Sequence, residues 1–215
     1  MLGKFITFEG GEGCGKTTQI GLLAADLEQR GYDVLHVREP GGTAVGERIR
    51  SILLAKESDG LDSVAELMLY EAARAQICKD VIRPALAAGK IVLCDRFYDS
   101  TIAYQGYGRG LDVQLIRRLN DAATDGLKPD ATIMLFIDSV EGLRRAMGVT
   151  GGDGEGDRIE AAGLAFHQRV HDGFARIAME EPDRVAVVGA SGTAEEVHAA
   201  VLARVMTLLS SAETA

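Results

Sequence analysis

The chain has 215 residues, of which 47% are apolar and 26% are charged, a composition typical of a globular protein built as one domain. Its net charge of −9 and its lack of tryptophan count against a nucleic-acid-binding function, since such surfaces are basic and stack bases on aromatic rings. The same charge does not exclude a phosphorylated small molecule, which local arginines and backbone amides can bind.

Targeting and redox features favour the cytoplasm. The sequence has no run of about 18 uncharged apolar residues, so we expect no membrane-spanning helix. A strand pattern begins within the first five residues, so we expect no signal peptide. The three cysteines match neither a disulfide framework nor a zinc site. We therefore expect a cytoplasmic protein whose partners are small molecules, with no nucleic acid and no membrane.

Short apolar runs alternate with longer segments of helical spacing along the chain. The expected strands cover residues 4–9, 33–38, 91–95, 131–137 and 184–188. Four of the five are nearly continuous apolar runs, as in strands covered on both faces. Alternating strands and helices predict an α/β fold with a five-stranded parallel sheet surrounded by helices, in a single domain of residues 1–215.

Local sequence signals mark three helices. Residues 16–30 place apolar side chains on one face, and the segment stops at a glycine. Ser63 with Glu66, and Thr193 with Glu196, have the spacing of capping boxes, in which the two side chains bond reciprocally to backbone N–H groups. We therefore expect one helix to begin near Ser63 and another near Thr193.

A phosphate-binding loop follows the first strand in the pattern Gly-x-x-x-x-Gly-Lys-Thr, and a helix follows the loop. Its glycines let backbone amides approach phosphate oxygens, Lys16 adds a full charge, and the Thr17 hydroxyl is suited to bind magnesium. A glycine turn that only caps a helix is the simpler alternative. A GTP-dependent switch would need an Asn-Lys-x-Asp segment, which is absent, so a kinase is favoured. The expected ATP-binding residues are Gly10, Gly11, Glu12, Gly13, Cys14, Gly15, Lys16, Thr17 and Thr18.

Asp95 and Arg96 directly follow the third strand, so both are expected at the ligand-binding edge of the sheet. Asp95 can bind magnesium directly or through water. Arg96 can bind phosphate oxygens with two parallel hydrogen bonds, which a lysine cannot. The alternative is an ion pair that closes the strand.

Two further groups have the chemistry to bind a base. Tyr70 and Arg74 share a helix face, so a ring and a guanidinium lie together, although a buried tyrosine beside a solvated arginine is an equal reading. Gln105 offers a donor and an acceptor suited to the polar edge of a pyrimidine base, and Thr101 lies one turn earlier.

The chain resembles the thymidylate kinase family in six segments that occur in the family's order. They are FEGGEGCGKTT, REPGGT, LYEAAR, DRF, AYQG and DRIE. The resemblance implies a P-loop NTPase fold, a three-layer α/β/α sandwich with a lid. It also implies magnesium-dependent transfer of the γ-phosphoryl group of ATP to dTMP, giving dTDP and ADP in dTTP biosynthesis, by a homodimer.

The resemblance also implies roles for single residues. Tyr70 and Arg74 pack against the thymine ring and contact its polar edge. Tyr104 lies near the sugar and favours deoxynucleotides, and Glu12 faces the 3′-OH of dTMP. Arg38 lies in a turn beside the dTMP pocket.

The expected lid, about residues 146–159, departs from the family pattern. Bacterial relatives without a P-loop arginine carry arginines in the lid, whereas this lid is rich in glycine and acidic residues, with Arg158 as its cation. We expect Lys16, Arg96 and Arg158 to be catalytic. Arg144 and Arg145 are alternatives to Arg158, and Lys16, Arg96 and magnesium without any lid arginine are a third possibility.

Two rival functions fit the same motifs. One is another nucleoside monophosphate kinase or small-metabolite kinase, which a panel of acceptors would distinguish. The other is a nucleotide-binding module without phosphoryl transfer. The complete phosphoryl-transfer set at Lys16, Thr17, Asp95 and Arg96 argues against the second.

Overall fold

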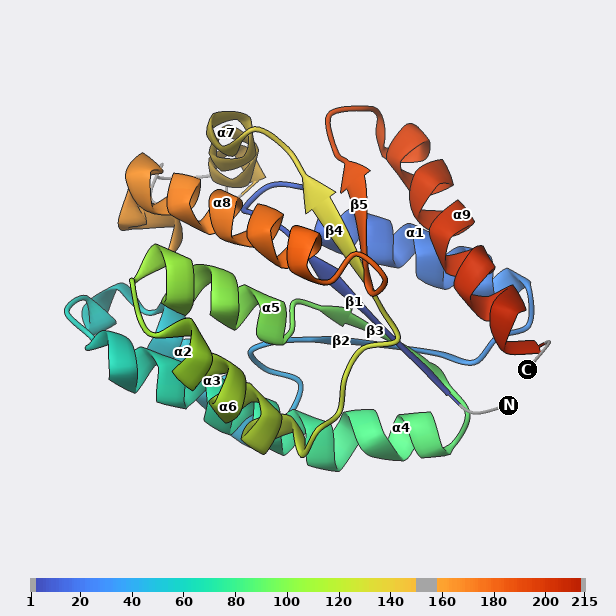
Figure 1. Cartoon of the computed structure of the whole chain (residues 1–215), viewed down its shortest axis with the longest axis horizontal. Helices are drawn as coiled ribbons and strands as arrows, with labels where there is room; N and C mark the ends of the chain where they lie inside the picture. Colours follow the sequence, from blue (N-terminus) through green and yellow to red (C-terminus); the bar gives the residue numbers. More distant parts are fainter. Residues whose placement is uncertain (1–2, 150–157, 214–215) are drawn as a thin grey trace.

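The computed structural model describes residues 3–149 and 158–213. Its centre is a five-stranded parallel sheet in the order β2-β3-β1-β4-β5 (Figure 1). The strands are β1 Lys4–Glu9, β2 Val34–Arg38, β3 Ile91–Asp95, β4 Ala131–Phe136 and β5 Val185–Gly189. The predicted α/β fold is confirmed, and each predicted strand is found within one residue at either end.

One face of the sheet is covered by α1 (Lys16–Gln29) and α9 (Ala194–Glu213). Their apolar side chains form a buried cluster with the sheet that includes Ile20, Leu23 and Val201. Because both faces of the strands are covered, β1 is buried at every residue after Lys4, and β3 is buried at every residue before Asp95.

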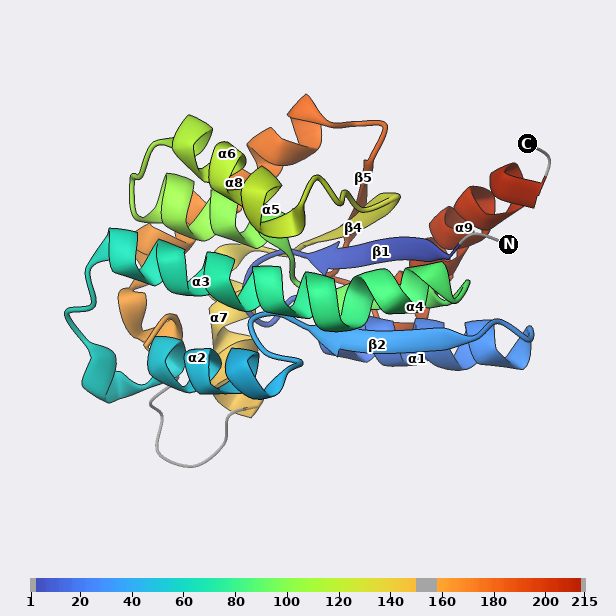
Figure 2. The ribbon, with the colours of Figure 1, turned by 90° about the horizontal axis from the view of Figure 1, so that it is seen from below.

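The other helices cover the second face and the strand ends (Figure 2). They are α2 Ala44–Leu54, α3 Ser63–Ile77, α4 Arg83–Ala87, α5 Tyr98–Thr101, α6 Val113–Thr124, α7 Ser139–Val149 and α8 Leu164–Glu180. A π-helical segment, Cys78–Ile82, joins α3 to α4, and a second, Ile102–Gly108, continues α5. Short 3₁₀ turns occur at Lys56–Ser58 and Glu160–Ala162.

The two predicted capping boxes have different outcomes. At α9, Thr193 and Glu196 bond reciprocally to each other's backbone N–H groups, as predicted. At α3 the helix begins at Ser63 as predicted, but the capping box is wrong, because the capping side chain is that of Asp62, which accepts from the N–H groups of Val64 and Ala65. Glu66 is instead fully buried among polar side chains of other elements.

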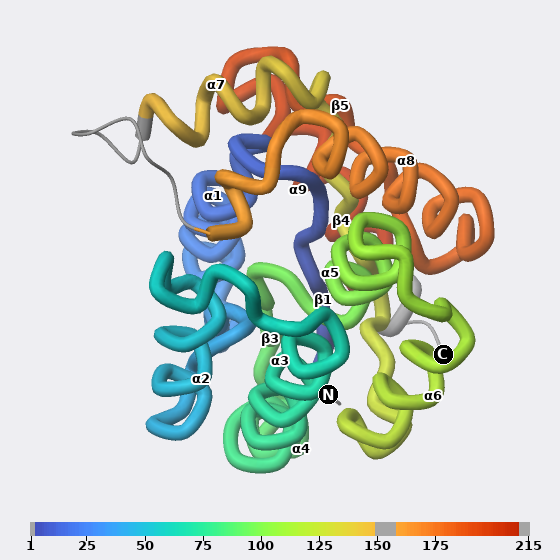
Figure 3. Tube along the Cα trace, turned by 90° about the vertical axis from the view of Figure 1, so that its left-hand side faces the viewer, coloured from blue at the N-terminus to red at the C-terminus, as the bar shows by residue number. Residues whose placement is uncertain are grey.

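The carboxyl ends of the strands face the viewer in Figure 3. Helices α7 and α8 lie on one side of these ends, and α2 and α3 lie on the other. In this part of the molecule the loop between β1 and α1 meets the turn after β3. None of the helices among residues 3–149 and 158–213 is long and apolar enough to span a membrane. Most of the predicted lid, residues 150–157, lies outside the described residues.

Candidate active site

The loop of residues 10–18 follows a backbone path that glycine adopts readily and other residues do not. Gly10, Gly13 and Gly15 have φ values of 136°, 63° and 88°. A Cβ atom on Gly13 would lie 2.0 Å from the carbonyl oxygen of Gly142 in α7. The loop therefore packs against α7 and leads into α1, which has no side-chain cap. The first N–H groups of α1 are thus available to an anion.

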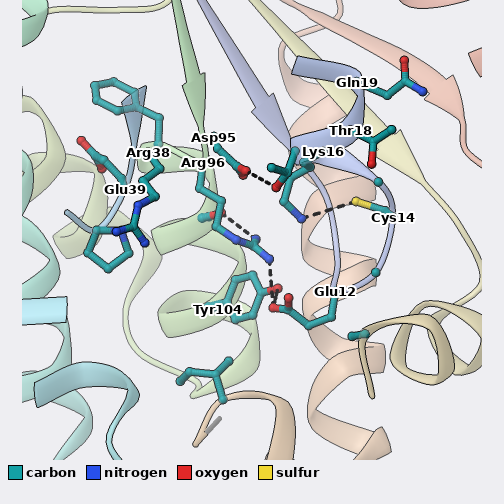
Figure 4. Close-up of a pocket in the computed structure, with 18 of the residues that line it drawn as sticks. Glu12, Cys14, Lys16, Thr18, Gln19, Arg38, Glu39, Asp95, Arg96 and Tyr104 are labelled. Carbon is teal, nitrogen blue, oxygen red and sulfur yellow. Dashed lines mark hydrogen bonds and ion pairs between the residues drawn. The ribbon is translucent and has the colours of Figure 1, made fainter. Parts of the chain in front are cut away.

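Lys16, the first residue of α1, folds its side chain back over this loop (Figure 4). Its Nζ donates to the carbonyl oxygens of Gly10 and Gly11 at 3.2 and 2.9 Å, and it lies 3.4 Å from the Sγ of Cys14. The ammonium is therefore held at the loop, where it can bind the oxygens of a phosphate group.

Thr17 and Asp95, the two predicted metal ligands, lie in direct contact. The Oγ1 of Thr17 donates to the Oδ2 of Asp95 at 2.7 Å, which joins the first turn of α1 to the end of β3. Among the described residues no group of three or more His, Cys, Asp and Glu side chains forms a metal site. Two oxygen ligands still suit magnesium, which commonly takes one or two protein ligands and completes its shell with phosphates and water.

Arg96 is bound to the P-loop by its guanidinium (Figure 4). Its Nη1 donates to the carbonyl oxygen of Gly10 at 3.0 Å and to the Oγ of Ser100 at 3.1 Å. Its Nη2 donates to the Oε1 of Glu12 at 2.9 Å, and the guanidinium lies 5.0 Å from the ring centroid of Tyr104. Arg96 has a φ of 67°, a left-handed conformation that is rare for an arginine and that turns its side chain into the cavity.

Glu12 carries a charge that the surrounding groups stabilise. Burial alone would raise its pKa, but Arg96, Lys16 and a 2.6 Å hydrogen bond from the hydroxyl of Tyr104 lower the pKa to about 2. The carboxylate that the sequence places inside the phosphate loop is therefore an ion-pair partner. It holds Arg96 and Tyr104 together at the mouth of the loop.

Glu9 supports the site without lining the cavity, and the sequence analysis missed it. Its Oε1 accepts from the N–H groups of Phe97 at 2.7 Å and Ser100 at 3.2 Å, and its Oε2 accepts from the Ser100 hydroxyl at 2.6 Å. These bonds fix the turn that carries Arg96. Burial, and then the charge of Asp99, raise the pKa of Glu9 to about 7. A signal was present, since this acidic residue lies between the run Phe5-Ile6-Thr7-Phe8 and the P-loop.

Arg74 is almost fully buried and is enclosed by polar side chains. Its Nε donates to Glu39 at 2.8 Å, and its Nη1 donates to Glu71 at 3.1 Å and to Asn120 at 2.8 Å. Burial raises the pKa of Glu39 to about 7 against the opposing charge of Arg74. The pKa of Arg74 itself is raised, because its two carboxylate partners outweigh the effect of burial. The reading of Arg74 as a solvated surface arginine is therefore wrong.

A second polar cluster surrounds Glu66 on α3. Its Oε1 accepts from the Nε2 of Gln105 at 2.8 Å and from the Nε of Arg109 at 3.2 Å. Its Oε2 accepts from Arg109 at 3.2 Å and from Arg158 at 2.5 Å. Arg158 also donates to the carbonyl oxygen of Leu53 at 2.9 Å, and its side chain is only 8% exposed.

The predicted residues gather around a cavity of about 860 Å³. Those that line it are Glu12, Gly13, Cys14, Gly15, Lys16, Thr17, Thr18, Arg38, Tyr70, Arg74, Asp95, Arg96, Thr101, Tyr104 and Gln105. Gly10, Gly11 and Arg158 are not among its lining residues, although Ile159 and Glu160 are.

Thr101, Arg38 and Tyr70 also line the cavity, and they differ in burial and in hydrogen bonding. Thr101 is buried, and its hydroxyl has no hydrogen-bond partner among the described residues. Arg38 is half exposed and pairs with Glu47 at 2.9 Å. Tyr70 is partly buried on the same helix as Arg74. The structure thus brings the phosphate-binding and base-binding candidates to the same space.

The two arginines before the predicted lid lie differently. Arg144 is not among the residues that line the cavity and is largely exposed, and its hydrogen bonds within the described residues both go to Glu141. Arg145 lines the cavity, where its Nε donates to Glu141 at 2.8 Å and its Nη1 donates to the carbonyl oxygen of Ala190 at 3.2 Å.

Comparison with known proteins agrees with this geometry. A family model described as thymidylate kinase matches residues 8–201. The chain belongs to the thymidylate kinase family. The thymidylate kinase of Geotalea uraniireducens is 49% identical over 97% of this chain and 99% of its own. That of Gloeobacter violaceus is 55% identical over 92% of this chain and 93% of its own.

A solved structure of the thymidylate kinase family has the same fold. The thymidylate kinase of Ehrlichia chaffeensis superposes with a TM-score of 0.78 at 38% identity, covering 95% of this chain and all of that one. As a member of this family the chain is a P-loop nucleoside monophosphate kinase that transfers a phosphoryl group from ATP to dTMP, as the sequence predicts.

Proposed function

We propose that ATP and dTMP meet across Arg96, with the triphosphate on the P-loop and the phosphate of dTMP on the opposite side of the guanidinium. One observation carries this proposal. Arg96 contacts the P-loop at Gly10, where ATP would bind, and the Glu12–Tyr104 pair, where dTMP would bind. A single cation therefore borders both proposed nucleotide positions. A fork of N–H donors in this position suits a phosphoryl group as it passes from one oxygen to another.

On the donor side, the P-loop amides and the α1 N-terminus would bind the phosphates of ATP, and Lys16 would bind the terminal one. Magnesium would be held by Thr17 and Asp95, whose oxygens are already adjacent, and would neutralise charge that develops on the phosphates. The expected ATP-binding set of residues 10–18 is retained as part of this proposal.

On the acceptor side, Tyr70, Arg74, Thr101 and Gln105 would surround the thymine ring, and Arg38 would lie at the edge of the pocket. Arg74 is fixed by Glu39, Glu71 and Asn120, which supports a role in reading the base because its direction cannot vary.

The sugar of dTMP would lie beside the Glu12–Tyr104 pair. The hydroxyl of Tyr104 donates to Glu12 at 2.6 Å, so the ring is held beside this carboxylate. In the proposed pose the ring would crowd a 2′-hydroxyl, which supports a preference for deoxynucleotides. Glu12 offers a carboxylate oxygen to the 3′-hydroxyl of dTMP.

The transition-state charge would be met by Lys16, Arg96 and Arg158. Lys16 and Arg96 line the cavity already. Arg158 is next to Ile159, which lines it, but its guanidinium pairs with Glu66, so a catalytic role requires that pair to open. The variant Arg158→Ala, treated in the Discussion, tests this role.

A homodimer would form through α2 and α3. Val45 and Ile52 on α2, and Val64 and Met68 on α3, are each 44–48% exposed, which supports an apolar contact with a second copy. Ile52→Glu with Met68→Glu should convert a dimer to a monomer in light scattering. Met179→Glu, at an 80% exposed site on α8, should leave the mass unchanged. A wild-type mass of one chain would contradict the proposal.

The cytoplasm is proposed as the compartment. Cys14, Cys78 and Cys94 are all free thiols and all buried, which fits a reducing environment.

The acceptor assignment is tested by measuring ADP release with dTMP, dUMP, dCMP and AMP at a fixed ATP concentration. We expect the highest kcat/KM with dTMP. Equal rates with AMP would contradict the acceptor assignment, and binding of both nucleotides without ADP release would favour a binding module.

A further inference from the structure

The orientation of the Gln105 side-chain amide is set by a buried carboxylate. The Nε2 of Gln105 donates to the Oε1 of Glu66 at 2.8 Å, and both residues are at most 1% exposed. An ionised carboxylate accepts hydrogen bonds and donates none. The amide nitrogen, and not the amide oxygen, must therefore face Glu66.

Glu66 is kept ionised by the cations around it. Burial alone would raise its pKa, but hydrogen bonds from Gln105, Arg109 and Arg158 and the charge of Arg109 lower the pKa below its ordinary value. Each arginine approaches within 3.2 Å of the carboxylate. The carboxylate therefore stays an acceptor-only group near neutral pH.

With its nitrogen engaged, Gln105 has only its oxygen left for a ligand. The Oε1 of Gln105 makes no hydrogen bond with the described residues, and Gln105 lines the cavity. Arg74 has the opposite character, since it presents N–H groups only, and no hydrogen bond from its Nη2 occurs in the described part of the chain. Of the groups proposed to surround the base, Gln105 can therefore only accept and Arg74 can only donate, whereas the hydroxyl of Thr101, which has no partner among the described residues, can do either.

This pair matches one class of pyrimidine. Thymine and uracil carry an N–H donor at position 3 and an acceptor oxygen at position 4. Cytosine has the reverse pattern, an acceptor nitrogen at position 3 and an amino donor at position 4. We propose that Glu66 is a positioning residue that selects thymine over cytosine by holding the amide oxygen of Gln105 toward the base.

The proposal rests on the placement of the thymine ring at Gln105 described under the proposed function. Its test compares dUMP with dCMP, which differ only at positions 3 and 4 of the ring. In Glu66→Gln the new amide can donate to Gln105, so the Gln105 amide can rotate and present N–H groups to the cavity. We expect the ratio of kcat/KM for dUMP over dCMP to fall roughly tenfold or more, mainly through KM.

Arg109→Gln is the matched control. It removes a cation from the same cluster and leaves the acceptor oxygens of Glu66 in place, so the ratio should stay as in the wild type. A general loss of packing would instead raise KM for dUMP and dCMP by the same factor in both variants.

A third variant keeps the test decisive if Glu66→Gln fails to fold because of the positive charge that it leaves unbalanced. The side-chain charges of Glu66, Arg109 and Arg158 sum to +1, and Glu66→Gln raises the sum to +2. The double variant E66Q/R109Q restores +1 and should show the same fall in the ratio. An unchanged ratio in this variant would overturn the proposal.

Gln105→Leu separates the proposal from the placement on which it rests. If the base lies at Gln105, this variant raises KM for dTMP and narrows the gap between dUMP and dCMP. If Gln105→Leu leaves KM for dTMP unchanged, the placement of the base is wrong. If Gln105→Leu raises KM while the Glu66 variants keep the wild-type ratio, the placement stands and the role of Glu66 is refuted.

Discussion

The guanidinium of Arg96 and the carboxylate of Glu12 lie 2.9 Å apart and join the turn after β3 to the P-loop. Both side chains are only 18% exposed, and Tyr104 contacts both of them. A surface ion pair would contribute little, whereas a pair held in this enclosed geometry fixes where the cation lies. The position of Arg96 is thus set before any substrate binds.

Arg96→Lys should lower kcat roughly 10²–10³-fold, because a lysine supplies a point charge and cannot keep the contacts to Gly10 and Glu12 together. Steady-state rates with dTMP and ATP measure this. Arg117→Lys, which changes an arginine that pairs with Glu180 and Glu181, is the control and should leave kcat unchanged. A similar kcat in both variants would refute the role of Arg96.

Thr17→Val should raise the Mg²⁺ concentration needed for half-maximal activity roughly tenfold or more, since it replaces the hydroxyl beside Asp95 with a methyl group. Thr17→Ser keeps the hydroxyl and should behave as the wild type. The measurement is a magnesium titration of activity at saturating substrates. An identical titration for Thr17→Val would remove Thr17 from the proposed metal site.

Arg158→Ala should lower kcat far more than it raises KM for dTMP, because a cation aimed at the transferring phosphoryl group acts only in the transition state. The structure makes a different result informative. Arg158 bonds to Glu66 and to the Leu53 carbonyl oxygen, so a purely structural arginine would give a lower melting temperature with kcat unchanged. Thermal unfolding and kinetics on the same sample distinguish the two.

Glu9 should make the folded protein less stable as the pH rises. Burial raises its pKa to about 7, above the ordinary value of 4.5, so the folded state binds this proton more tightly than the unfolded state. Its stabilising contribution is complete below pH 4.5 and is lost as the pH rises through about 7. In urea unfolding between about pH 5 and 8, Glu9→Gln should therefore show a smaller decline than the wild type.

Glu12→Gln provides the control for that experiment. The pKa of Glu12 is about 2, so this group is ionised in both folded and unfolded protein across most of the same range. Its replacement should shift the curve without changing the slope. An equal change of slope in both variants would show that Glu9 is not the group responsible.

Gly13→Ala should destabilise the protein by about 1–3 kcal/mol more than Gly60→Ala. Both glycines have positive φ, at 63° and 89°, so both substitutions carry the cost of a left-handed backbone. Only at Gly13 does the added Cβ meet backbone, with the carbonyl oxygen of Gly142 2.0 Å away, whereas Gly60 faces open space. Chemical denaturation measures the difference, and equal values would contradict the packing of the P-loop against α7.

The sheet and the phosphate loop are the parts that the sequence predicts well. Buried parallel strands are continuous apolar runs, and the P-loop pattern has a fixed place between a strand and a helix, so both signals are local. Asp95 and Arg96 are predicted for the same reason, because they follow a strand whose end lies at the ligand edge.

The polar clusters behind the proposed base-binding residues were not predictable, because their partners are far apart in the chain. Arg74 bonds to Glu39 and Asn120, which are 35 and 46 residues away. The local pattern Ser-x-x-Glu predicts a capping box that includes Glu66. Its actual partners Gln105 and Arg158 are 39 and 92 residues away, and nothing near Glu66 in the sequence points to them.

The order of the strands has a consequence for which parts of the molecule open first. The P-loop follows β1 and the Asp95–Arg96 turn follows β3, and both strands are paired on either side, whereas β2 and β5 form the edges. Local opening in proteins begins at edges and termini, where it costs least free energy. Brief fraying of an edge strand therefore leaves the proposed phosphate-binding residues assembled, and their geometry is lost only in the rare events that open the centre of the sheet.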